Sequence, residues 1–169
     1  MTASVDPTLD RLFRQEVWVL RKLFAFLRSL PEDVLAMTAP NTGWDISVLL
    51  THIVSASVTY AARIDGRPDA DLQPPDTHAD LAAMEVEAIA AAERLRELAA
   101  EGSDAEVVEV DGERTWRYPR SLILAQSIYH AIEHRAQLFG VLTANGVAGL
   151  TLDDLDHWTY GGDEGVLSS

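Results

Sequence analysis

The chain has no cysteine among its 169 residues, so it forms neither disulfides nor thiolate–metal bonds. Any metal site must therefore use nitrogen and oxygen donors. Basic residues are also scarce, because 13 Lys and Arg stand against 27 Asp and Glu, which gives a formal net charge of −14. Phosphate binding needs a clustered basic face, so this balance argues against nucleic acid as a partner.

Long hydrophobic runs are missing as well. No uninterrupted apolar stretch approaches the roughly 20 residues of a membrane span, and residues 1–7 lack the basic and apolar regions of a signal peptide. We therefore expect a cytoplasmic protein with no membrane partner. The length is that of one domain, and we expect a single domain over residues 1–169 with a core of about residues 8–160.

Apolar periodicity predicts four helices, at about residues 8–30, 44–64, 79–100 and 120–144. The apolar stripe of the first is broken only by Glu16. Thr42 and Asp45 fit a capping box at the start of the second. The alanines of the third indicate close packing against a neighbour, either inside the bundle or across a dimer.

Residues 106–118 alternate in polarity around Asp111-Gly112, which predicts a short β-hairpin. The tail of residues 152–162 carries aromatic side chains that favour burial against the rest of the protein, and we expect the tail to fray beyond Gly161. The predicted fold class is all-α, a four-helix bundle with a short β-hairpin before the last helix.

Two histidines stand out in the last predicted helix. His130 and His134 are four residues apart, which places them roughly 40° apart on one helix face, where they can share one transition metal. His52, in the second helix between Leu49 and Ile53, is a third candidate ligand if the two helices are neighbours.

These histidines also fit roles that need no metal. The pair can be exposed or hydrogen-bonded on its own, and His52 can be a core histidine satisfied by serine or threonine. His78, near a predicted helix start, and His157, in the tail, are not assigned as ligands.

Several further residues are candidates for the surroundings of the site. Gln126 and Gln137 lie on the same helix face as the histidine pair. They are candidates for hydrogen bonding to the ligands or to a substrate, and the alternative is that they are polar residues at one end of the bundle. Trp116 and Trp158 are candidate pocket walls, or plain packing residues. Arg135 points away from the pair, and we expect it in a structural ion pair.

Three histidines without a carboxylate describe an open site, in which water or substrate completes the coordination sphere. Ala131 follows His130 where zinc proteases place a glutamate, so that mechanism is not indicated. A bound metal can lower the pKa of water, which supports hydrolysis, or coordinate an external thiol, which supports S-transfer or isomerisation.

These features resemble the DinB-like superfamily over about residues 8–160. The resemblance is carried by Trp44 with His52 eight positions later, by the tail 155–161, and by the run His130-x-x-x-His134-Arg135-x-Gln137. It implies an up-down-down-up bundle that forms a homodimer, with a divalent ion such as zinc or nickel on the three histidines.

Characterised relatives in that superfamily include mycothiol-dependent maleylpyruvate isomerase and bacillithiol S-transferases. The resemblance thus implies a small-molecule substrate and a low-molecular-weight thiol such as mycothiol or bacillithiol. We expect no separate C-terminal domain of the kind that some mycothiol-dependent members carry. The expected function is a metal-dependent, thiol-using transferase or isomerase; the alternatives are a metal-dependent hydrolase and a non-catalytic, stress-related metal-binding dimer.

Overall fold

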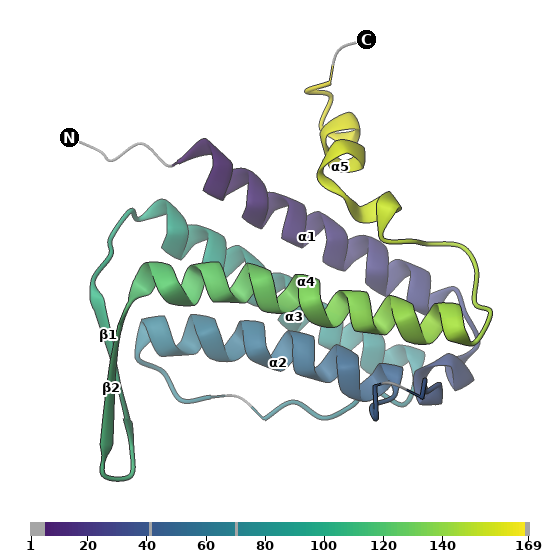
Figure 1. The fold of residues 1–169 in the computed structure, drawn as a ribbon, viewed down its shortest axis with the longest axis horizontal. Coiled ribbons are helices and arrows are strands. Elements are labelled where there is room, and N and C mark those ends of the chain that lie inside the picture. Colours follow the sequence, from purple (N-terminus) through teal and green to yellow (C-terminus); the bar gives the residue numbers. More distant parts are fainter. Residues whose placement is uncertain (1–5, 41, 70, 168–169) are drawn as a thin grey trace.

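A computed structural model describes residues 6–40, 42–69 and 71–167. This part of the chain is mostly helical and carries one two-stranded antiparallel sheet. Its long helices lie side by side, with α2 and α3 beginning at one end of the group and α1 and α4 at the other (Figure 1). These helices are α1 (Pro7–Arg28), α2 (Ile46–Asp65), α3 (His78–Ala100) and α4 (Arg120–Ala144).

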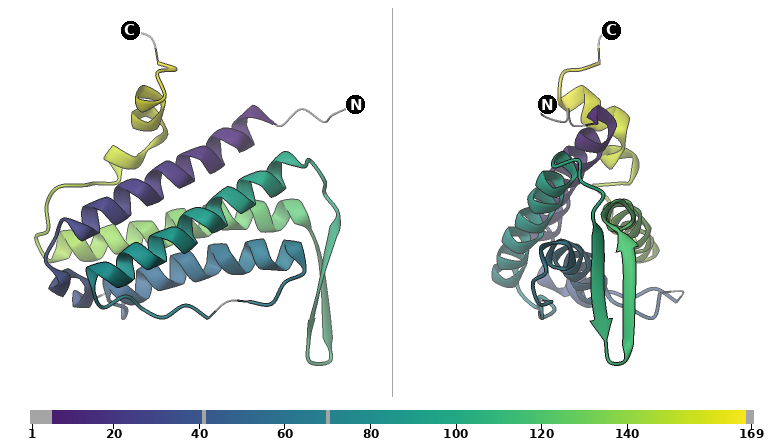
Figure 2. Two further views of the ribbon diagram at one scale, coloured as in Figure 1. Left: turned by 180° about the vertical axis from the view of Figure 1, so that it is seen from behind. Right: turned by 90° about the vertical axis from the view of Figure 1, so that its left-hand side faces the viewer.

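The four predicted helices are therefore present, and their apolar stripes meet in one core. α1 packs mainly on α3, while α2 lies against both α3 and α4 (Figure 2). Four of the nine alanines in α3 are buried inside this packing, namely Ala88, Ala91, Ala92 and Ala99, as are Leu81 of α3 and Leu138 of α4. The largest contributions from α1 and α2 come from fully buried side chains: Leu23, Phe24, Leu27, Leu49, Leu50 and Ile53.

The apolar character of α2 corrects one expectation. Within the described residues this helix is long and apolar enough to cross a membrane by length and composition, although we expected no stretch of that kind. A core helix passes the same test, and α2 buries Leu49, Leu50, Ile53 and Val54 among its neighbours. Its apolar composition is thus accounted for by the core.

The start of α2 also differs from the prediction. Asp45 is the N-cap, and its Oδ1 accepts a 2.7 Å hydrogen bond from the backbone N–H of Val48. The predicted Thr42–Asp45 capping box is wrong, because the Thr42 hydroxyl donates to backbone carbonyls, including that of Trp44 at 2.9 Å. The helix begins at Ile46, which leaves Trp44 on the segment before it.

A buried ion pair explains the polar break in the stripe of α1. Arg135 Nη1, on α4, donates to both carboxylate oxygens of Glu16, at 2.8 and 2.9 Å. Both side chains are buried, so each charge has its partner in the core. The expectation that Arg135 makes a structural ion pair is confirmed.

The predicted hairpin is present as β1 (Glu106–Asp111) and β2 (Arg114–Pro119), and it projects from the helices (Figure 1). Gly112 in its turn has a φ of +59°, a left-handed conformation that glycine adopts without a Cβ clash. The strands pair antiparallel, with Glu109 opposite Trp116 and Val107 opposite Tyr118.

The C-terminal segment is more ordered than predicted. After the short 3₁₀ helix η2 (Asp153–Leu155), α5 (His157–Asp163) continues past Gly161, so the expected fraying at that residue is wrong. Polar contacts with α1 hold it: Trp18 Nε1 donates to Asp163 at 3.1 Å, and Arg14 pairs with Glu164. A second 3₁₀ helix, η1 (Glu32–Ala36), joins α1 to the segment before α2.

Candidate metal centre

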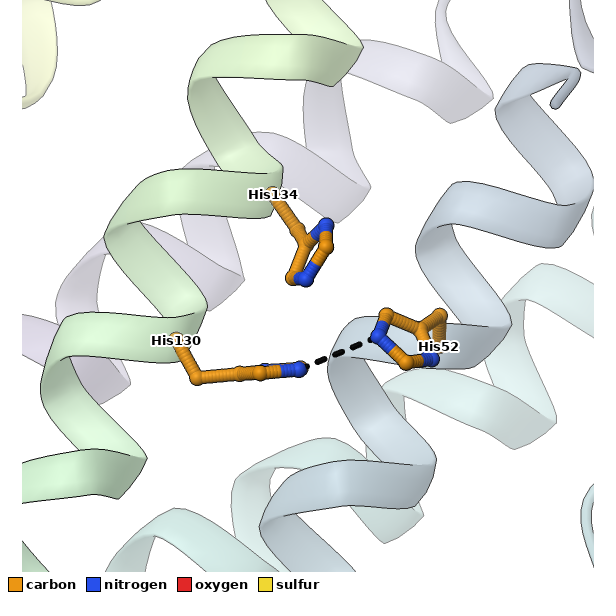
Figure 3. A group of neighbouring side chains, drawn as sticks. All are labelled: His52, His130 and His134. Atoms are coloured by element: carbon orange, nitrogen blue, oxygen red, sulfur yellow. Dashed lines mark hydrogen bonds between the residues drawn. The ribbon is translucent and has the colours of Figure 1, made fainter. Parts of the chain in front are cut away.

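The structure brings the three candidate histidines together between α2 and α4. His52 comes from α2, and His130 and His134 come from one face of α4, with all three rings directed at a common point (Figure 3). Their ring centroids lie 4.3–4.7 Å apart, and one ring nitrogen from each lies within 4.8 Å of the others. Three ring nitrogens this close together could serve as ligands of one divalent ion.

Each imidazole finds its polar partner inside the group or beside it. His52 Nε2 and His130 Nε2 are 3.0 Å apart, so one ring must donate its proton to the other when no ion lies between them. Among the described residues, no serine or threonine hydroxyl is hydrogen-bonded to His52. The interpretation of His52 as a core histidine satisfied by a hydroxyl is therefore set aside, and two nitrogens facing one another fit shared ligation.

Gln137 fixes the orientation of His134. Its Oε1 lies 2.9 Å from His134 Nδ1, which donates to it and leaves the Nε2 lone pair for the common point. Metal-binding histidines are commonly held in this way, so this contact supports the role expected for Gln137. Gln126 is exposed on α4 and makes no hydrogen bond to the histidines among the described residues.

Two aromatic rings border the histidines. The Trp44 ring lies 4.9 Å from His52 and 6.0 Å from His134, centroid to centroid, and the Tyr60 ring meets His130 edge-on at 6.0 Å. Tyr60 was not among the wall residues predicted from the sequence, although its position two helical turns after His52 was a usable signal.

The two tryptophans that we proposed as walls lie elsewhere. Trp116 is 49% exposed on the projecting hairpin, and Trp158 is 74% exposed on α5, where it lines a separate cavity with Arg11 and Leu12 of α1. The structure does not bring either ring to the histidines. His157 is exposed beside Trp158, and His78 Nε2 lies 2.9 Å from the carbonyl of Leu30, so neither is a ligand candidate.

The surroundings keep two of the candidate ligands, His52 and His130, unprotonated. Burial, followed by the nearby rings of His134 and His52, lowers the pKa of His130 to about 4. Burial and His134 also lower the pKa of His52. Both rings are neutral at neutral pH, which is the form that binds metal. The grouped side chains include no carboxylate, so the donor set is nitrogen only.

Comparison with known proteins agrees with this architecture. The DinB family matches residues 1–164, nearly the whole chain. The chain belongs to the DinB family. Its fold is similar to that of a DinB family member protein from Shewanella denitrificans, solved by crystallography, with a TM-score of 0.57, 14% sequence identity and 88% of each chain covered. At this identity the likeness to the solved structure concerns the fold alone. No curated protein matches the chain.

Proposed function

We propose that this DinB-family chain is a divalent-metal-dependent enzyme that uses a low-molecular-weight thiol, as an S-transferase or isomerase acting on a small molecule. The observation that carries the proposal is the convergence of three imidazoles from two helices, with no carboxylate among them. Imidazole nitrogen suits zinc and nickel, and three protein ligands leave a coordination position for an outside group. The choice of a thiol, such as mycothiol or bacillithiol, rests on the family resemblance.

When bound, such an ion supplies Lewis acidity to a sulfur or oxygen ligand. The chain prepares the site for that ion. Gln137 holds His134 in the tautomer that presents Nε2, and the depressed pKa values of His52 and His130 keep those rings unprotonated. Trp44, 39% exposed, packs on two of the three rings and covers one side of the group.

The shared starting ends of α2 and α3 favour the up-down-down-up order implied by the family resemblance (Figure 1). We also propose that the four helices belong to a single domain and that the protein is cytoplasmic. Circular dichroism during urea unfolding tests the domain assignment, since one domain should unfold in a single transition.

A homodimer is also proposed, through the outer face of α4. Leu122, Tyr129 and Ile132 are 57%, 67% and 51% exposed there. Of the charged residues in α4, only Glu133 is exposed. For a chain with a net charge of −14, an apolar face with one charge is where a second copy can approach with least repulsion. Sedimentation should show a dimer that Ile132→Glu converts to a monomer.

Metal content is the first test of the proposed function. Untagged protein prepared without chelator should carry about one zinc or nickel ion per chain by mass spectrometry, since one open site needs one ion. His52→Ala and His134→Ala should each lose that ion while keeping the helical circular dichroism spectrum. Wild-type protein that takes up neither metal would overturn the proposal.

Thiol binding separates the proposal from its alternatives. Cobalt-loaded protein should develop a sulfur-to-metal charge-transfer band on titration with mycothiol or bacillithiol, and turnover should require the thiol. Ester hydrolysis without any thiol would favour the hydrolase instead. An ion that exchanges no ligand and whose removal unfolds the protein would favour the non-catalytic dimer.

A further inference from the structure

A cavity of about 350 Å³ lies next to Gln137, between α4 and the segment that precedes α2. Its volume falls in the range of about 300–1,000 Å³ that is usual for small-molecule sites. Gln137 belongs to both features, because its Oε1 accepts from His134 while its side chain lines the cavity. The cavity is thus one side chain away from a candidate metal ligand. It is lined by Ala39, Pro40, Thr42, Gln137, Gly140 and Ala144.

The described residues that line the cavity have small or uncharged side chains. Thr42 already uses its hydroxyl proton on backbone carbonyls. With Oε1 committed to His134, Gln137 retains its Nε2 group, which carries two N–H donors and is hydrogen-bonded to no described residue. Among the described residues, the cavity therefore offers hydrogen-bond donors within apolar walls, and no cation.

Gly140 adds a second, independent observation. Glycine in the middle of a helix is less stable than alanine, so a packing reason is normally found for it. Here an added Cβ would meet no heavy atom within 4 Å. Packing against the described residues therefore does not explain this glycine, and the space beside its Cα is open to the cavity.

We propose that this cavity binds an uncharged carbonyl group of the substrate, an amide or ester, whose oxygen accepts from Gln137 Nε2. The small apolar substituent of that carbonyl lies against Gly140 and Ala144. A carboxylate fits less well. It would lose its hydration, and no described lining residue supplies a cation to compensate its charge in a chain with a net charge of −14. The inference deepens the proposed function and rests on it for the link between this ligand and the metal.

The probe is isobutyramide, titrated into ¹⁵N-labelled protein as purified, with the side-chain NH₂ signals of Gln137 as the readout. These signals should shift in a saturable way. Isobutyrate has the same shape with a charge, and isobutanol keeps the branched substituent but lacks the carbonyl. Both should bind at least about tenfold more weakly, as expected for a site built around one hydrogen bond.

Gly140→Leu adds a side chain at the cavity wall, where its Cβ meets no heavy atom within 4 Å, and Ala144→Leu is the second variant should the first fail to fold. Either should abolish the isobutyramide shifts while metal content stays unchanged. Ala90→Leu, on the exposed side of α3, is the matched control and should leave the shifts intact.

Three results would overturn the inference: no shift at Gln137, equal binding of isobutyrate, or shifts that persist in Gly140→Leu. Failure of the proposed function has a different signature. If the protein takes up no metal, yet isobutyramide shifts Gln137 and Gly140→Leu removes the effect, the cavity assignment holds and the metal enzyme does not.

Discussion

Removal of one partner from the buried Glu16–Arg135 pair should be among the most damaging single changes in this chain. The side chains are only 9% and 7% exposed, and Arg135 Nη1 donates to both carboxylate oxygens. Arg135→Met leaves the Glu16 charge uncompensated in the core, which costs about 3–5 kcal/mol. Glu16→Leu combined with Arg135→Met removes both charges, so the double variant should return to within about 1 kcal/mol of wild type, or exceed it.

Urea unfolding followed by circular dichroism on the wild type, both single variants and the double variant measures this coupling. For a chain of this length the single loss corresponds to a melting temperature lower by about 6–20 °C. Arg117→Met is the matched control, because Arg117 is 59% exposed in its pair with Glu106 and should contribute less than about 1 kcal/mol. A cost below about 1 kcal/mol for Arg135→Met, or a double variant as unstable as the two single variants summed, would refute the reasoning.

Four further predictions concern the site and its supports. His52→Ala and His134→Ala should lose the metal and keep the fold, as read by elemental analysis and circular dichroism; retention of the ion by either contradicts a shared site. Gln137→Leu should weaken zinc binding about 10–100-fold in a competition titration, because His134 loses its orienting acceptor. The pKa of His130 falls from 6.5 to about 4 on folding, so the unfolded chain takes up this proton first as the pH drops. Metal-free protein should then lose melting temperature as the pH falls from about 6.5 to 4, and a flat profile over this range would count against that burial. Asp45→Ala should cost about 1 kcal/mol in urea unfolding through the lost N-cap, and no change would mean that another group caps α2.

The helices were predictable because their signal is local. An apolar residue at every third or fourth position marks a buried face wherever the partner lies, and α1 to α4 appear close to the predicted ranges. Their ends were less certain, since Thr42 and Asp45 are both residues that cap helices. Which of them caps depends on the path of the chain before α2, where the Thr42 hydroxyl bonds the carbonyl of Trp44.

Some parts of the candidate site could be predicted from the sequence and others could not. The shared face of His130 and His134 follows from helix geometry alone. The approach of His52 depends on α2 lying against α4, which periodicity does not specify and the family resemblance implied. The aromatic surroundings needed tertiary structure, because Trp116 and Trp158 have the same chemistry as Trp44 but stand on a projecting hairpin and on α5.

The ion pair shows most clearly what a sequence leaves open. Glu16 interrupts an apolar stripe, and this alone predicts a buried partner of opposite charge. Its partner lies 119 residues away, so the ion pair expected of Arg135 could be assigned to Glu16 only once α1 and α4 are brought together. Arg135 sets the side of α4 that faces α1. With that side of α4 facing α1, His130 and His134 face α2 and Tyr129 is exposed. The buried ion pair is therefore linked to both the candidate metal site and the proposed dimer face.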